Sequence, residues 1–177
     1  MGDGRDPEGV LLTGAYGTGK STMLAELAYL MEDQPYAAID LDWLSWFGGA
    51  DHGEAAHRML LTNLGSVVEN YRAVGVRYFL MARALRTADE VDGLRRTLGM
   101  PMRVVRLTLP IEEIERRLGA DVTTERREEL LEAAAWVEGG VGAGFEDRTF
   151  ANDGPIAGTA EEILAWLGWP RGQRSPS

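Results

Sequence analysis

Gly14-Ala15-Tyr16-Gly17-Thr18-Gly19-Lys20-Ser21 fits the pattern G-x-x-x-x-G-K-[ST] at every fixed position, and Thr22 follows directly. The apolar run 9–13 before this stretch has the length of a buried strand, and residues 21–31 after it carry apolar side chains at helical spacing. Between a strand and a helix, such glycines let successive backbone N–H groups point into one concavity, and the helix N-terminus adds partial positive charge. We expect residues 14–22, the phosphate loop, to bind the phosphates of ATP, with Lys20 at the β- and γ-phosphates and Ser21 as a ligand of Mg²⁺.

The bulk composition is typical of one globular domain. The chain has 177 residues, of which 45% are hydrophobic and 26% charged. We expect a single domain over residues 1–170 and a flexible tail over 171–177. The absence of cysteine excludes disulfides, thiolate metal sites and a cysteine nucleophile. No apolar run approaches the ~20 residues of a membrane helix, and residues 1–7 lack an apolar signal region, so we expect a cytoplasmic protein without membrane contact.

The net charge argues against a general nucleic-acid partner. It is −10, from 18 Lys and Arg against 28 Asp and Glu. Proteins that bind nucleic acid are usually basic on at least one face, although a local cluster of arginines would still allow it. Lys20 is the only lysine, and it stands where a phosphate loop needs one.

Strands and helices are predicted to alternate along the whole chain. We expect strands at 9–13, 36–39, 76–81, 103–109 and 148–151, and helices at 21–31, 53–72, 87–98, 110–118, 124–138 and 159–169. Thr87 and Glu90 have the spacing of a capping box. This alternation predicts an α/β fold with a parallel sheet covered on both faces, in which ligands bind at the carboxyl ends of the strands.

A phosphate loop alone does not separate kinases from GTPases, motor ATPases and transporters. The chain lacks the D-x-x-G and N-K-x-D patterns of GTPases, and the run 80–83 that ends the third predicted strand has no carboxylate of the kind that AAA-type and ABC-type ATPases carry. Two carboxylates, Asp40 and Asp42, instead follow the second predicted strand.

With these residues the sequence resembles the small P-loop kinases, such as shikimate, gluconate, adenylylsulfate and nucleoside monophosphate kinases and chloramphenicol phosphotransferase. The resemblance rests on the phosphate loop, the D-x-D at Asp40 and Asp42, arginines that flank a short interruption after the fourth strand, and the turn 152–154 before the last helix. It implies a three-layer α/β/α fold with a five-stranded parallel sheet in the order 2-3-1-4-5 and a short lid. It also implies transfer of the ATP γ-phosphate to a small acceptor, which no matched residue identifies.

Asp40 and Asp42, the acid pair, suit phosphoryl transfer to a hydroxyl. Phosphoryl transfer to a hydroxyl needs an aligned nucleophile, a carboxylate for its proton, and cations for the phosphate charge. We expect Asp40 to be catalytic or linked to the metal and Asp42 to be catalytic through its binding of the acceptor; which of the two is the base stays open. The alternative is that both are solvated acids that cap the next helix.

Arginines on both sides of the interruption 119–123 form the second predicted group. In the resembled kinases a lid at this place brings arginines to the transferred phosphoryl group, and we expect Arg117 and Arg126 to do so here as catalytic residues. The alternative is pairing with acidic residues of the same helices, such as Glu113 and Glu129.

The remaining expectations concern the acceptor and the adenine. Arg83, after the third strand, is expected to bind a charged part of the acceptor, and Trp43 and Trp46 to form an apolar wall for it. The alternatives are a solvated loop for Arg83 and core packing for the tryptophans. Asn152 and Asp153 are expected to flank the adenine.

The sequence thus predicts an ATP- and Mg²⁺-dependent phosphotransferase whose acceptor is a hydroxyl of a nucleoside or nucleotide, a sugar-like metabolite or an antibiotic. The alternative is a nucleotide-binding NTPase or regulatory protein that acts on a partner. A toxin-like kinase of a nucleotide sugar, or a kinase of polynucleotide ends, is a third possibility. The choice between ATP and GTP, and between monomer and homodimer, stays open.

Overall fold

The phosphate loop follows the central strand of a five-stranded parallel sheet whose order is β2-β3-β1-β4-β5. A computed structural model describes residues 6–47, 53–119 and 124–172. The predicted sheet and its order are confirmed. The strands are β1 (Glu8–Thr13), β2 (Tyr36–Asp40), β3 (Tyr78–Ala82), β4 (Met102–Thr108) and β5 (Arg148–Ala151).

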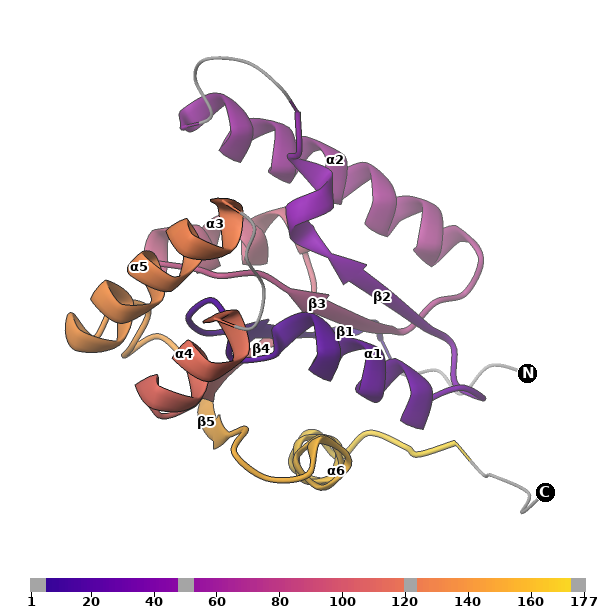
Figure 1. The fold of residues 1–177 in the computed structure, drawn as a ribbon. Helices are drawn as coiled ribbons and strands as arrows, with labels where there is room; N and C mark the ends of the chain where they lie inside the picture. The colour runs from indigo at the N-terminus through magenta and orange to yellow at the C-terminus, as the bar shows by residue number, and fades with distance from the viewer. Residues whose placement is uncertain (1–5, 48–52, 120–123, 173–177) are drawn as a thin grey trace.

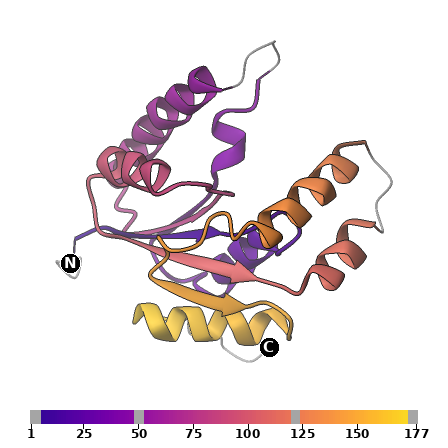
Figure 2. The same cartoon turned by 90° about the vertical axis from the view of Figure 1, so that its left-hand side faces the viewer.

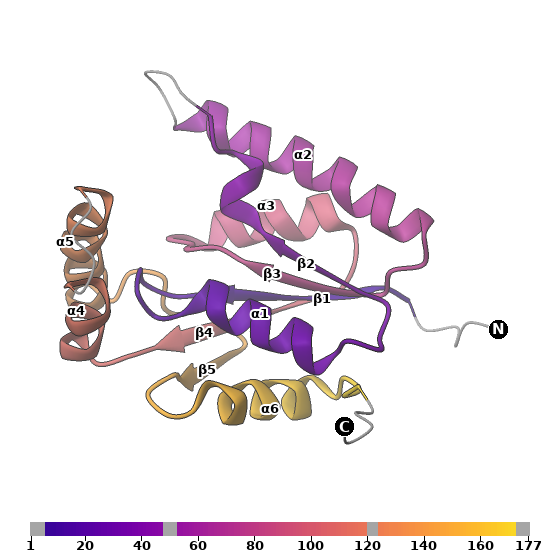
Figure 3. The same cartoon turned by 45° about the vertical axis from the view of Figure 1, so that its right-hand side comes forward.

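Helices cover both faces of the sheet and one of its ends. On one face lie α1 (Lys20–Leu30) and α6 (Ile156–Leu167), and on the other lie α2 (Glu54–Ala73) and α3 (Ala88–Leu98), as Figures 1 and 2 show. Beyond the carboxyl ends of the strands stand α4 (Ile111–Gly119) and α5 (Thr124–Glu138), which contact each other (Figure 3). A short 3₁₀ helix, η1 (Leu41–Leu44), follows β2 directly. No helix in the described ranges is long and apolar enough to cross a membrane.

The alternation of side chains along β1 builds two hydrophobic cores at once. Val10 and Leu12 belong to the core under α1 and α6, and Leu11 belongs to the core under α2 and α3; none of the three is exposed. Full burial of such a side chain stabilises the fold by about 1.5–3 kcal/mol. The strand that presents the phosphate loop is therefore anchored on both sides.

The register brings the carboxyl ends of three strands level. Asp40 at the end of β2 pairs with Ala82 of β3, which pairs with Leu12 of β1 one residue before that strand ends. The residues after β2 and β3 therefore emerge beside the phosphate loop, as expected for a parallel sheet.

The structure differs from the predicted elements mainly at two boundaries. Helix α6 begins at Ile156 rather than at Thr159, because Pro155 caps its N-terminus at φ −60°, an angle that proline favours. Strand β3 begins at Tyr78 rather than at residue 76. The turn that closes α2 occupies the residues before it: Gly75 takes φ +89°, and the N–H of Val76 bonds to Tyr71. The predicted capping box of α3 is confirmed.

Candidate active site

Two glycines of the phosphate loop are required by its backbone. Gly14 takes φ +138° and Gly19 takes φ +88°. A Cβ on Gly14 would collide with the carbonyl oxygen of Leu107, and a Cβ on Gly19 would lie 2.7 Å from Nδ2 of Asn152. Conformation and close approach therefore both demand glycine at these positions.

The loop is also held by hydrogen bonds. The hydroxyl of Thr18 donates to the carbonyl of Ala15 at 2.8 Å, and the amide of Asn152 donates to the carbonyl of Thr18 at 2.8 Å. Asn152 is buried, whereas its neighbour Asp153 is exposed. Of the two residues predicted to flank adenine, the structure thus places Asn152 against the loop and leaves Asp153 at the surface.

Lys20 folds back over the loop. Its Nζ donates to the carbonyls of Gly14 and Ala15, both at 3.0 Å, and lies 5.4 Å from the ring centroid of Tyr16. Burial lowers the pKa of Lys20 to about 8, although the negative charges of Asp42 and Asp40 act against that shift. Phosphate oxygens are stronger partners for an ammonium group than neutral carbonyls are, so the site suits an anionic ligand.

Asp40 links the loop to the second strand. Its Oδ2 accepts a hydrogen bond from the hydroxyl of Ser21 at 2.8 Å, and its Oδ1 accepts one from the N–H of Asp42 at 3.2 Å. The second bond caps η1, so the predicted alternative of helix capping also occurs. A hydroxyl and a carboxylate in contact are oxygen donors of the kind that Mg²⁺ takes beside phosphates and water. These two residues therefore fit a magnesium ion.

Asp42 and Arg83 form an ion pair beside Asp40. Nη1 of Arg83 lies 3.1 Å from Oδ1 of Asp42, and it also donates to the hydroxyl of Ser45 at 3.3 Å. Burial raises the pKa of Asp42; the charge of Arg83 acts against that shift and the charge of Asp40 adds to it. Arg83 thus holds Asp42 and the chain after it in place, so it is not the solvated loop residue that the alternative described.

Trp43 and Trp46 lie at the surface next to this ion pair. Their rings stack with centroids 4.7 Å apart, and the side chains are 69% and 66% exposed. The alternative of core packing is therefore wrong for both tryptophans.

Arg117 reaches the phosphate loop from α4. Its Nε donates to Glu113 at 2.9 Å, and its Nη2 donates to the carbonyl of Asn152 at 3.3 Å. A Cβ on Gly19 would lie 3.6 Å from its Nη1. Pairing within the helix, the predicted alternative, thus coexists with a hydrogen bond to Asn152, the residue that holds the loop. The interruption 120–123 and the side chain of Arg126 lie outside the described residues.

Helix α5 adds contacts that the sequence did not indicate. Trp136 is buried, packs edge-on against Tyr16 at 6.3 Å between ring centroids, and lies under the guanidinium of Arg86 at 5.2 Å. Arg86 also pairs with Glu132 at 2.8 Å. Burial, followed by the charge of Glu132, raises the pKa of Tyr16. The only sequence signal was a lone tryptophan near the end of this predicted helix.

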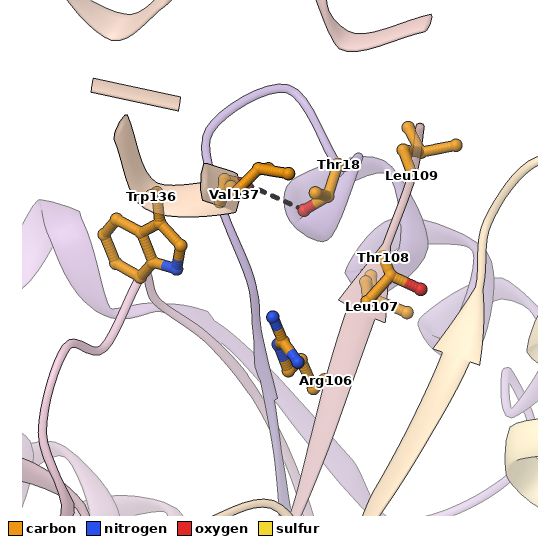
Figure 4. Close-up of a pocket in the computed structure, with 8 residues that line it drawn as sticks. Thr18, Arg106, Leu107, Thr108, Leu109, Trp136 and Val137 are labelled. Carbon is orange, nitrogen blue, oxygen red and sulfur yellow. Dashed lines mark hydrogen bonds between the residues drawn. The ribbon is translucent and has the colours of Figure 1, made fainter. Parts of the chain in front are cut away.

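A separate cavity of about 130 Å³ lies behind the phosphate loop. Figure 4 shows Trp136 and Val137 on one side of it and Thr18, Leu107 and Thr108 on the other. The indole N–H of Trp136 has no hydrogen-bond partner among the described residues. Ala15 and Thr18 of the phosphate loop line this cavity, whereas neither aspartate of the acid pair does.

Solved structures with the same architecture include several kinases. The chain superposes on a sugar kinase from Janibacter sp. HTCC2649 with a TM-score of 0.69, at 18% identity over 93% of this chain and 95% of that one. For a tunicamycin resistance protein from Deinococcus radiodurans the TM-score is 0.67, at 15% identity over 96% and 100%. For an APS kinase from Mycobacterium tuberculosis, solved with AMPPNP and APS, it is 0.55, at 18% identity over 92% and 98%. No protein-family model matches the sequence, and no curated protein matches it.

These likenesses, at low identity, concern the fold. The chain has the fold of the small P-loop kinases, with the sheet order and phosphate loop in the places that the sequence predicted. The acceptor does not follow from the fold.

Proposed function

We propose that the chain is an ATP- and Mg²⁺-dependent phosphotransferase that moves the γ-phosphate to a hydroxyl of a small molecule. The observation that carries this proposal is the 2.8 Å contact between Ser21 and Asp40. It joins the hydroxyl of the phosphate loop to a carboxylate at the end of a neighbouring strand, and Asp42 follows two residues later. A phosphate site, a metal site and an acid for the acceptor then lie side by side.

The phosphate loop and Lys20 bind and orient the triphosphate. Backbone N–H groups of residues 14–22 surround the β-phosphate, and Lys20 exchanges its two carbonyl partners for β- and γ-phosphate oxygens. Arg117, already in contact with Asn152, and Arg126 are proposed to hold the transferred phosphoryl group. Asn152 and Asp153 are proposed to flank the adenine. ATP as donor is supported by the APS kinase with this fold, which was solved with AMPPNP.

Ser21 and Asp40 are proposed to hold the magnesium ion. When bound, the ion neutralises charge on the β- and γ-phosphates. Asp40 retains one oxygen for the N–H of Asp42, so the metal ligand and the second acid stay at a fixed spacing.

Asp42 is proposed to orient the acceptor hydroxyl and accept its proton. Its side chain is 56% exposed and forms the ion pair with Arg83. Its pKa, raised by burial, favours proton uptake compared with an ordinary aspartate. The acceptor oxygen forms a bond to the γ-phosphorus, the bond from that phosphorus to the β–γ bridging oxygen breaks, ADP leaves, and the proton passes to Asp42.

An acceptor screen tests this function. Protein with Mg·ATP is incubated with nucleosides, sugar acids and other polyols, and hydroxylated antibiotics, and ADP release and the thermal midpoint are recorded. We expect one class of acceptor to accelerate ADP release and to raise the midpoint, since a ligand that binds only the native state stabilises it. Lys20→Ala is the inactive control. ADP release that no acceptor accelerates, combined with stimulation by a protein partner, would favour the alternative NTPase.

A further inference from the structure

The surface next to Asp42 carries two large aromatic side chains that the fold itself does not use. Trp43 and Trp46 are stacked on each other, yet about two thirds of each remains exposed, at 69% and 66%. Contiguous exposed aromatic surface of this kind usually marks a binding site. The core beneath is filled without them, because Leu41 is fully buried and Leu44 packs against the same cluster.

The segment that carries the tryptophans is held in place rather than loose. Arg83 donates to the carbonyl of Leu41 at 3.4 Å and to the hydroxyl of Ser45 at 3.3 Å. From helix α2, the amide of Asn63 donates to the carbonyl of Leu44 at 2.7 Å. A ligand ring that stacks on the two tryptophans therefore meets a preorganised surface, so binding costs little conformational entropy of this segment.

The charges around this surface disfavour an anionic ligand. Asp42 is adjacent to Trp43, and the charge of Glu129 on α5 is close enough to act on the pKa values of both Lys20 and Asp42. Helix α5 stands at the same end of the sheet as the chain that follows β2 (Figure 3). Two described cations act on Asp42: Arg83, which is already paired with it, and Lys20, which the proposed function assigns to the phosphates of ATP.

We propose that the acceptor has a flat ring and no anionic group. Its ring stacks on Trp43 and Trp46, and its hydroxyl binds to the carboxylate of Asp42. This inference rests on the proposed function and narrows it to neutral or cationic ring-bearing alcohols. A ring gains stacking energy on the tryptophans, and a cation additionally gains from their π faces and from Asp42. A carboxylate or phosphate would have to displace Arg83 from Asp42.

A matched set of probes separates the contribution of the flat ring from that of the charge. The probes 1-phenylethane-1,2-diol, 2-amino-1-phenylethanol and mandelate share a phenyl ring and a benzylic hydroxyl and are neutral, cationic and anionic. A fourth probe, 1-cyclohexylethane-1,2-diol, lacks the flat ring. Dissociation constants are measured by ligand-observed NMR in the presence of Mg²⁺ and AMPPNP. We expect the phenyl diol and the amine to bind at least about fivefold more tightly than mandelate and the cyclohexyl diol. Equal affinities, or tightest binding of mandelate, would overturn the inference.

Paired variants test the tryptophans themselves. Trp43→Leu with Trp46→Leu should weaken the phenyl diol by about tenfold, which corresponds to about 1.4 kcal/mol. Trp43→Phe with Trp46→Phe retains flat rings and should recover most of that loss. Tyr71→Leu, a change of another exposed aromatic residue on α2, should leave the affinity as it is. An equal loss of AMPPNP affinity in the double Leu variant would indicate local misfolding and contradict the proposal. A second outcome would also contradict the proposal. If sedimentation shows that the unchanged protein is a stable dimer and that the double Leu variant is a monomer, a second copy of the chain covers the two tryptophans.

The two proposals fail in different ways. If the wider screen finds phosphorylated acceptors that are ringless or anionic, and the double Leu variant turns them over with unchanged kcat/KM, the inference is wrong and the proposed function stands. If no hydroxyl compound of any class receives phosphate, both are wrong.

Discussion

At the scale of single residues, Gly19 is the position at which the phosphate loop packs closely against Asn152. Its positive φ is unfavourable for any other residue, and a Cβ would press on the amide of Asn152. That amide donates to the carbonyl of Thr18, so displacing it also disturbs the loop.

Gly19→Ala should therefore lower the free energy of unfolding by more than the backbone strain alone accounts for. Gly75 provides the matched control, because it takes nearly the same φ, +89° against +88°, and a Cβ there meets nothing within 4 Å. We expect Gly75→Ala to lower the free energy of unfolding by about 1–2 kcal/mol from the left-handed conformation alone. Gly19→Ala should lower it further and should also weaken nucleotide binding, as measured by denaturant titration and calorimetry. Identical losses in stability with unchanged nucleotide affinity would contradict the described role of this contact.

Asp40 is the residue whose role depends most on the contact with Ser21. Asp40→Asn keeps the shape, and its one amide oxygen can still accept one of the two hydrogen bonds, but the change removes the charge that a magnesium ion and phosphates need nearby. We expect ATP binding to persist and the rate of phosphoryl transfer to fall by about a hundredfold or more, in the range of other groups that stabilise transition-state charge. Asp89→Asn, an exposed change in the first turn of α3, is the control. Full transfer activity in Asp40→Asn would remove the acid from the proposed mechanism.

At the scale of elements, α4 contacts Asn152 through Arg117, and the carboxylate of Glu113 holds that arginine. Glu113 accepts hydrogen bonds from both Arg116 and Arg117, and these bonds lower its pKa to about 2. Because the pKa is lower in the folded protein, the stabilising contribution is complete above the ordinary value near 4.5 and is lost as the pH falls toward 2.

We therefore expect the side-chain carboxyl of Glu113 to titrate far below the ordinary glutamate value of 4.5. A carbon-13 NMR titration of the carboxyl groups measures this midpoint directly, with assignment by Glu113→Gln. A midpoint for Glu113 at the ordinary value would show that the two arginines do not hold it in solution, and the contact from Arg117 to Asn152 would lose its support.

Most elements were predictable because each has a local signal. The phosphate loop, the apolar strands and the Thr87 capping box are all determined by neighbouring residues in the sequence, and the structure reproduces them. The start of α6 was wrong by three residues because a threonine with acidic residues after it competes with Pro155 as a start signal, and proline decided it.

The candidate site was only partly predictable, for a physical reason. The proximity of Asp40 to Ser21 follows from the sheet order. Asp40 ends β2, and Ser21 lies in the first turn of α1, after the loop that follows β1; the two strands are two positions apart in the sheet. The ion pair of Arg83 with Asp42, and the packing of Trp136 on Tyr16, depend on distances between segments far apart in the chain, and composition carries no information on these.

At the scale of the whole molecule, the residues that stabilise the fold are separate from the residues of the candidate site. Two hydrophobic cores lie on opposite faces of the sheet, and the polar residues of the candidate site lie at one end of it. The proposed phosphotransferase would need to keep water from the γ-phosphate during transfer. The helices beyond the strand ends, α4 and α5, are placed to contribute to this exclusion of water (Figure 3).

The fate of the γ-phosphate tests the central claim most directly. Protein, Mg·ATP and the acceptor that most accelerates ADP release are followed by phosphorus-31 NMR, with Lys20→Ala as the inactive control. The account predicts that the lost γ-phosphate signal reappears as a phosphomonoester of the acceptor in equal amount to the ADP formed. If the γ-phosphate instead appears only as inorganic phosphate, the protein hydrolyses ATP and is not a phosphotransferase.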